Sequence, residues 1–290
     1  MVPVSTWLLL LGCPDPALNN DSNSDTGTDG DLGGYLLSFF TGFILVQSGE
    51  LPASVATQGS ITTASAGFTT REGEEQTCTK RTLSRDCFDL SCTVTKVGTI
   101  VAFGAGTLDV AGLAQPIQLV EGAYEGVYTP FFVANSPSYF QPGVDATATA
   151  AGGTVPAFTL TTASPDQNLT VIEPPPPSAP TEAVPRDVDR RYEWLPTSFG
   201  KVTVRLDVQT GSLGEFRTLQ CSRLGLPLVN EMVLPLSEVD DFNEPSAIET
   251  IQYSSDATTM AGDFAVTFEL LSVVVAPDGS PYSTRTLLFE

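Results

Sequence analysis

Apolar and polar residues alternate in short runs along most of the chain. The clearest run, residues 202–208, reads Val-Thr-Val-Arg-Leu-Asp-Val. A period of two puts the apolar side chains on one face of a β-strand and the polar side chains on the other. We therefore expect a half-buried strand at this position. Similar patterns predict further strands at 93–97, 106–110, 158–162, 264–275 and 282–289.

Helical periodicity is much weaker than this alternation. No stretch keeps a period of 3.6 residues for three turns, and only residues 234–242 are expected to form a short helix. Threonine is abundant and favours strands, while Gly and Pro mark turns between them. The pattern predicts an all-β protein built from antiparallel β-sandwiches, with Trp194 as a candidate core residue.

Two changes in composition divide the chain. Residues 13–34 are rich in Asp, Asn, Ser, Thr and Gly and contain almost nothing to bury, which predicts a disordered acidic tether. Residues 173–185 include four consecutive prolines, which favour polyproline II and predict a semi-rigid linker. We therefore expect one β-sandwich domain at 35–172 and a second at 186–290.

The charge balance excludes several classes of function. The 290 residues include 13 Lys and Arg against 34 Asp and Glu, for a formal net charge of -21, and no His. This charge repels phosphate groups, so we expect no nucleic-acid partner. Without His, Ser-His-Asp catalysis, Cys-His catalysis and His-ligated zinc are all excluded. We expect no catalytic residues and a protein that is not an enzyme.

The beginning of the chain carries a short motif. An apolar run starts at Trp7 and ends in Leu-Leu-Gly-Cys at residues 10–13. This segment resembles the signal of bacterial lipoproteins, in which a lipobox of apolar and small residues precedes a cysteine. The resemblance implies that residues 1–12 are a signal peptide, that Cys13 carries fatty acyl groups, and that the chain is anchored in the cell envelope, at the outer membrane. The alternative interpretation is a short buried strand that ends in a free thiol.

The strand-rich remainder, residues 35–290, also has a known counterpart. Its pattern of short strands separated by turn residues resembles that of the immunoglobulin-like and jelly-roll modules of exported bacterial surface lipoproteins. The resemblance implies two such β-sandwich modules behind the acidic tether.

The remaining cysteines form an even set: Cys78, Cys87, Cys92 and Cys221. Two disulfides in an oxidising compartment suit this number, and three pairings are open. Zinc is the competing interpretation, but the spacing contains no C-x2-C pair and the chain has no His to complete a tetrahedron.

An aromatic stretch is the best candidate for a binding surface. Exposed aromatic rings stack on sugars and anchor protein partners. Tyr124 and Tyr128 are the favoured ligand-binding residues, because Gly122 and Gly126 beside them indicate a loop or an edge. The alternative is ordinary core packing, since at strand spacing half of the rings face inward. The stretch comprises Tyr124, Tyr128, Phe131, Phe132, Tyr139 and Phe140.

Carboxylates are the candidate metal ligands. Asp187 with Asp189, or Asp240 with Asp241, are candidates for a structural calcium site, because calcium prefers oxygen ligands. Residues 21–25 alternate like the start of an EF-hand loop, but the Gly and Glu that such a loop needs later are missing. We expect no cofactor other than this calcium.

Together these features predict a lipid-anchored cell-envelope protein that acts as a non-catalytic binding, adhesion or scaffold module. Its expected partners are the membrane, through the N-terminal lipid, and an envelope protein or polysaccharide. The first alternative is a calcium-dependent carbohydrate-binding module. The second is a glycoside hydrolase that uses carboxylates alone, which requires two Asp or Glu side chains in one cleft.

Overall fold

The structure is a computed structural model. It describes residues 40–49, 61–134, 137–176, 181–186, 188–209, 214–225, 230–239, 245–282 and 284–290. Within these ranges every regular element is a β-strand except one turn of 3-10 helix, Leu236–Glu238. The predicted all-β class is therefore confirmed. Of the short helix expected at 234–242, the structure describes residues 234–239, which contain only that single turn. The predicted signal peptide (1–12), Cys13 and the tether (13–34) lie outside the described residues.

The strands divide between a large sheet and a small one. The strands that precede the expected linker are β1 (Phe40–Gly49), β2 (Ile61–Glu72), β3 (Glu75–Ser84), β4 (Cys87–Lys96), β5 (Thr99–Ala102), β6 (Leu108–Ala111), β7 (Ile117–Leu119), β8 (Phe131–Ala134), β9 (Asp145–Ala150), β10 (Phe158–Ala163) and β11 (Asn168–Glu173). The strands that follow are β12 (Thr181–Val184), β13 (Arg190–Trp194), β14 (Lys201–Gln209), β15 (Glu215–Leu224), β16 (Glu231–Leu234), β17 (Ser246–Ala261), β18 (Phe264–Val275) and β19 (Arg285–Phe289).

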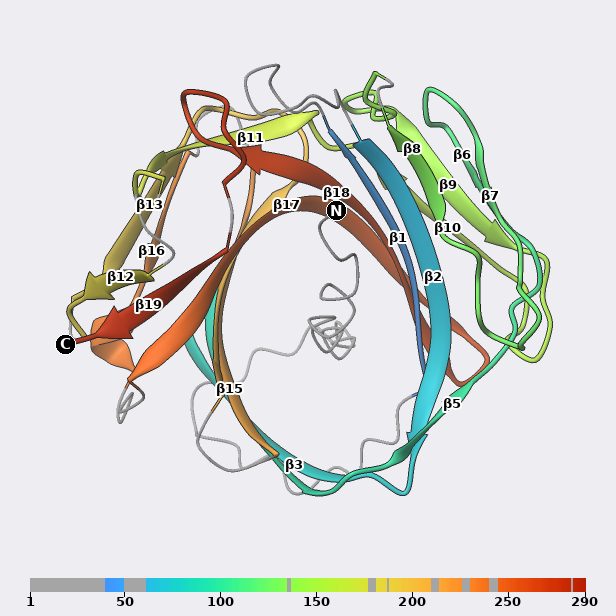
Figure 1. Cartoon of the computed structure of the whole chain (residues 1–290), viewed down its shortest axis with the longest axis horizontal. Coiled ribbons are helices and arrows are strands. Elements are labelled where there is room, and N and C mark those ends of the chain that lie inside the picture. The colour runs from blue at the N-terminus through green and yellow to red at the C-terminus, as the bar shows by residue number, and fades with distance from the viewer. Residues whose placement is uncertain are drawn as a thin grey trace.

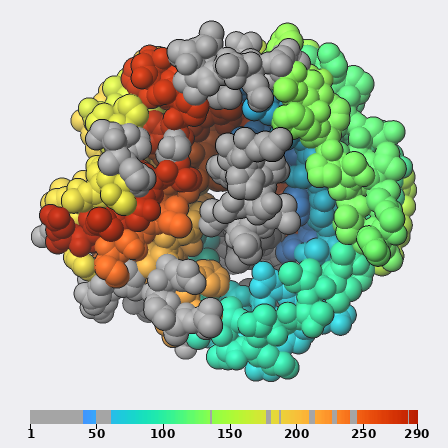
Figure 2. Space-filling model, in the orientation of Figure 1, coloured from blue at the N-terminus to red at the C-terminus, as the bar shows by residue number. Residues whose placement is uncertain are grey.

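The large sheet has 15 strands and curls strongly. Its main path runs β16-β13-β11-β18-β17-β14-β15-β4-β3, and β1 joins it by pairing with both β18 and β2. In Figure 1 the strands from β2 through β1, β18 and β17 to β15 and β3 trace an oval. The small sheet has four strands in the order β10-β9-β6-β7 and lies outside the oval, next to β1 and β2. Figure 2 shows it among the green residues on the right side of the molecule.

A long two-stranded ribbon closes the lower part of the oval. Strand β2 runs directly into β3, and β4 runs directly into β5, so that Glu72 pairs with Thr99 and Glu75 pairs with Lys96 across one continuous hairpin. At one end β2 pairs with β1, and at the other end β4 pairs with β15. The ribbon thus connects the two sides of the large sheet.

Two buried cores flank the large sheet. The first lies between β1, β2 and β18 and the small sheet, and contains Ile44, Phe68, Leu108 and Phe268. The second packs β14, β15 and β17 against β11, β13 and β16, and Trp194 is buried in it as predicted. The four apolar residues of the alternating run 202–208 are all buried, so the apolar face of β14 points into this core as the alternation predicts.

The pairing of strands does not follow the expected boundary at 173–185. Strand β1 pairs in parallel with β18, β4 pairs with β15, and β12 forms within the expected linker and pairs with β19. The two halves therefore share one sheet instead of forming two separate sandwiches. The physical reason is that alternation specifies which face of a strand is buried but not which strand lies beside it.

The four predicted cysteines form two disulfides, Cys78–Cys92 and Cys87–Cys221. Both join residues that face each other directly in paired strands. Since all four sulfurs are used, none of these cysteines can be a zinc ligand. Disulfides persist in oxidising compartments, so the pairs indicate an extracytoplasmic protein. In the part of the chain that the structure describes, no helix has the length and apolar character needed to cross a membrane.

Candidate functional site

The best candidate site is a small hairpin at residues 120–129, between β7 and β8. The backbone N–H of Thr129 donates to the carbonyl of Val120 (3.1 Å), and that of Gly122 donates to the carbonyl of Val127 (2.7 Å). At the tip, Val127 donates to the carbonyl of Tyr124 (3.2 Å). We call this feature the Tyr124 hairpin.

Gly126 allows the chain to turn at this tip. Its φ of 74° lies in the left-handed region, as the third residue of a type II turn requires. A Cβ at this position would lie 2.5 Å from the backbone nitrogen of Phe103. Any other residue would therefore clash with the neighbouring strand connection as well as strain the turn.

Tyr128 anchors one face of the hairpin to the protein. Its hydroxyl donates to the carbonyl of Gly106 and accepts from the backbone N–H of Ala105, both at 2.9 Å. Its ring packs edge-on against Phe68 in the first core. Burial raises the pKa of the Tyr128 hydroxyl, which keeps it protonated and able to donate. Of the two tyrosines that the sequence singles out, Tyr128 is thus part of the scaffold.

Two carboxylates brace the same hairpin. The Oε1 atom of Glu125 accepts from the hydroxyl of Thr154 (2.5 Å) and from the backbone N–H of Gly104 (3.2 Å). The Oε1 atom of Glu121 accepts from the backbone N–H of Gly126 at 2.5 Å. The bonds from Thr154 and Gly104 lower the pKa of Glu125, so its carboxylate stays ionised at neutral pH.

Tyr124 is the residue that this bracing displays. Its side chain is 77% exposed, and Val120 and Val127 on the same hairpin are each 52% exposed. The other described tyrosines are at most 8% exposed: Tyr128, Tyr139, Tyr192, Tyr253 and Tyr282. The hairpin therefore places one large amphipathic ring in solvent on a turn held by hydrogen bonds.

Of the predicted calcium ligands the structure describes only Asp189, so the calcium site stays a prediction. Asp187, Asp240 and Asp241 lie outside the described residues. The Oδ1 atom of Asp189 already accepts from the backbone N–H (3.0 Å) and the hydroxyl (2.6 Å) of Ser237. In the ranges that the structure describes, no group of three or more His, Cys, Asp or Glu side chains is arranged to hold a metal ion.

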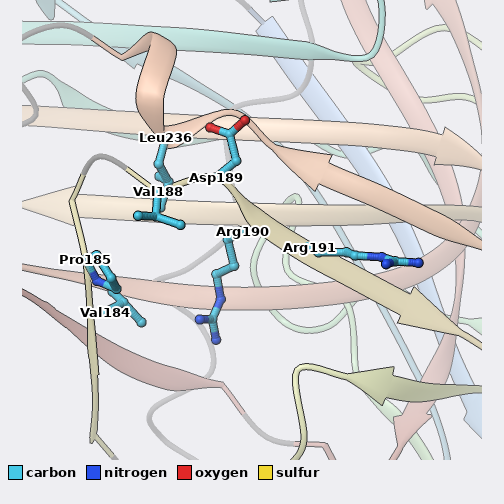
Figure 3. A pocket seen from close by; sticks show the side chains of 7 residues that line it. All are labelled: Val184, Pro185, Val188, Asp189, Arg190, Arg191 and Leu236. Atoms are coloured by element: carbon cyan, nitrogen blue, oxygen red, sulfur yellow. The ribbon is translucent and has the colours of Figure 1, made fainter.

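A shallow pocket of about 200 Å³ lies beside Asp189. Figure 3 shows that its three charged side chains point in different directions, so they do not converge on a common ligand. The guanidinium of Arg190 already donates to Glu249 through Nε and to Glu182 through Nη1 and Nη2. The lining comprises Val184, Pro185, Val188, Asp189, Arg190, Arg191 and Leu236.

Arg190, which lines the pocket, belongs to an ionic cluster of two arginines and two glutamates in which Glu182 is 35% exposed and the others are largely buried. Arg190 pairs with Glu249 (2.8 Å) and Glu182 (2.9 Å), and Arg285 pairs with the same two carboxylates, at 2.7 Å from Glu182. The hydroxyl of Tyr192 also donates to Glu249. The cluster holds β12, β13, β17 and β19 together.

The charged groups of this cluster are paired with one another. Glu182 and Glu249 do converge, as a carboxylate-only hydrolase would require, but each is bonded to both arginines. Burial and the neighbouring Glu249 raise the pKa of Tyr192, and burial raises that of Tyr282. Burial alone would lower the pKa of Arg190; Tyr192, Glu249 and Glu182 raise it, so the arginine remains charged.

This cluster was not predicted from the sequence, although the sequence contains a signal for it. In β19, Arg285 occupies the same alternating face as Leu287 and Phe289, and all three are buried. In β17, Glu249 likewise shares a face with the buried Ala247. A charged residue at an apolar position of an alternating run predicts a buried partner of opposite charge.

No family model matches the chain, and no curated protein sequence is significantly similar to it. Among solved structures, a crystal structure of the FN1-FN3 domains of chicken CNTN1 is similar at 12% sequence identity, with a TM-score of 0.16. The similarity covers 67% of this chain and 64% of that one. A similarity at this TM-score carries no argument about fold or function.

Proposed function

We propose that this chain is an extracytoplasmic, non-catalytic binding protein of the cell envelope. In this proposal Cys13 carries the lipid anchor, residues 13–34 hold the folded part away from the membrane, and the Tyr124 hairpin contacts the partner. The two disulfides support the extracytoplasmic location, and the resemblance of residues 10–13 to a lipobox supports the lipid anchor at Cys13.

The exposure of Tyr124 is the observation that carries the binding function. A tyrosine supplies a large contact area at a low cost in conformational entropy, and a rigid loop lowers that cost further. The hairpin combines the two, because Tyr124 is exposed while Glu121, Glu125 and Tyr128 fix the backbone beneath it. By contrast, Glu182 and Glu249, the pair of carboxylates that a hydrolase would require, are each paired with two arginines.

The anchor is tested by metabolic labelling with a palmitate analogue. We expect label on the wild-type chain and none on Cys13→Ala. Equal labelling of the two proteins, or a wild type that is soluble and unlabelled, would contradict the anchor.

The binding function is tested separately with purified Cys13→Ala protein, which lacks the lipid. We expect it to sediment with isolated cell envelopes, and we expect Tyr124→Ala in the same background to lose this association. Phe132→Ala is the matched control, since its ring is also exposed (62%) but lies on β8 outside the hairpin. Equal sedimentation of the Tyr124 and Phe132 variants would contradict the assignment of the site.

A further inference from the structure

We infer that the Tyr124 hairpin binds a neutral polysaccharide, with the ring of Tyr124 stacked on a sugar ring. This inference rests on the proposed binding function and adds the class of ligand and the residue that contacts it. Four properties of the hairpin lead to it: the faces of its two strands, the size of its apolar surface, its charge and its rigidity.

The two faces of the hairpin differ in character. Glu121 and Tyr128 form a bridge pair and point toward the protein, where Tyr128 bonds to residues 105–106. Because successive side chains in an extended strand alternate, Val120 and Val127 project to the opposite side. These two valines and Tyr124 are the exposed large apolar side chains of the hairpin.

The size of this surface fits a sugar better than a protein. A stable protein interface buries roughly 800 Å² on each partner and has a desolvated centre. The exposed large apolar side chains of the hairpin are only three, Val120, Tyr124 and Val127. An aromatic ring with two flanking aliphatic side chains matches the C–H face of one or two sugar rings, and such stacking needs no larger contact.

Charge restricts the ligand further. No Lys or Arg occurs between Lys96 and Arg186, so the whole small sheet and the hairpin carry no basic residue. The hairpin itself contributes Glu121 and Glu125. Anionic polysaccharides and phosphate-bearing lipids would be repelled by this part of the molecule. Sugar hydroxyls, in contrast, are uncharged and are not repelled.

The rigidity of the hairpin also favours ligand binding. The hydrogen bonds of Glu121, Glu125 and Tyr128 already hold the backbone in place without a ligand. Binding of a ligand to Tyr124 therefore costs little conformational entropy, because the loop is already ordered.

The inference is tested by affinity electrophoresis of the purified Cys13→Ala protein in gels that contain one soluble polysaccharide each. The neutral panel is an α-glucan, a β-glucan, a mannan and a galactan, and alginate is the anionic comparison. We expect at least one neutral polysaccharide to retard the protein and alginate not to do so. Tyr124→Ala should weaken retardation about tenfold, the loss expected for one aromatic contact of ~1.4 kcal/mol, and Tyr124→Phe should retain it because the ring remains.

Phe132→Ala serves again as the exposed-ring control and should migrate like the parent protein. Melting temperatures of all variants should be equal, because both side chains are exposed. The inference is overturned if no neutral polysaccharide retards the protein, if alginate retards it more strongly, or if Tyr124→Ala is retarded as much as its parent. If envelopes still bind the protein in a Tyr124-dependent way while the neutral panel fails, the binding function stands and the sugar assignment falls.

Discussion

Arg285 and Glu249 form an ion pair in which each side chain is only 1% exposed. Breaking a buried pair from one side leaves an unpaired charge in a poorly polarisable environment. We therefore expect Arg285→Met to lower the free energy of unfolding by about 3 to 5 kcal/mol. Chemical denaturation of the two proteins measures this difference.

A surface ion pair provides the control for this substitution. Arg191 pairs with Glu231 at 2.7 Å, but the two side chains are 60% and 55% exposed. Exposed pairs contribute about 0 to 1 kcal/mol, so Arg191→Met should change stability little. Similar losses for Arg191→Met and Arg285→Met would show that the buried cluster does not stabilise the fold.

The two disulfides should contribute unequally. Cys87–Cys221 spans 134 residues and Cys78–Cys92 spans 14. In the chain-entropy model the longer loop stabilises by about 5 kcal/mol and the shorter one by about 3 kcal/mol. Denaturation of the paired Cys→Ser variants should therefore show the larger loss for Cys87 and Cys221. A larger loss on removal of Cys78–Cys92 would contradict the expectation that the longer loop stabilises the protein more.

Gly126→Ala should disturb the Tyr124 hairpin selectively. The positive φ and the close approach to Phe103 both oppose a side chain at this position. We expect a loss of about 1 to 3 kcal/mol together with weaker envelope binding. Ala123→Ser, a change at an exposed neighbouring position, should alter neither property. Unchanged stability and binding in Gly126→Ala would mean that the turn does not need its observed conformation.

Glu269 should make stability depend on pH. It lies opposite Asp256 in paired strands, and burial followed by the charge of Asp256 raises its pKa, although Ser254 and Lys201 act in the other direction. A carboxyl with a raised folded-state pKa favours folding most below its unfolded value near 4.5, and this contribution is lost as pH rises through the folded value.

Glu269→Gln should therefore stabilise the protein at pH 7 more than at pH 4, with a rise in melting temperature of about a few degrees at pH 7. The variant keeps an amide that can bond to Ser254. Thermal melts of both proteins across this pH range measure the effect. A variant that is less stable than the wild type at pH 7 would show that the ionised carboxylate is favourably paired.

Removal of calcium should leave the melting temperature unchanged. Asp189 is occupied by Ser237, and a bound ion would stabilise the folded state by mass action. Melting curves with added calcium and with a chelator make the comparison. A chelator-dependent decrease would instead support a site that includes Asp187, Asp240 or Asp241.

Faces of strands could be predicted from the sequence, whereas partners of strands could not. The alternation at 202–208 predicted which side chains of β14 are buried, and the apolar run at 264–275 coincides with β18. The pairing of β1 with β18 was not predictable, because hydrogen bonding along a strand edge does not depend on side-chain pattern. The proline-rich break at 173–185 was therefore an unreliable guide to sheet boundaries.

The candidate site could be predicted in part. Glycines beside Tyr124 and Tyr128 indicated a turn, and Gly126 indeed has the conformation that such a turn needs. Only the contacts of Tyr128 with residues 105–106 show that it anchors the hairpin while Tyr124 is displayed. Those contacts join segments more than 20 residues apart in sequence, and local pattern carries no information about them.

The parallel pairing of β1 with β18 constrains the order in which the molecule assembles. One edge of β1 pairs with the nearby strand β2, but on the other edge residues 40–48 pair with residues 264–272. A chain delivered from its N-terminus must therefore keep its first strand unpaired on that edge until almost the whole polypeptide has arrived. Closure of the large sheet along this edge therefore depends on a segment that lies far away in the sequence.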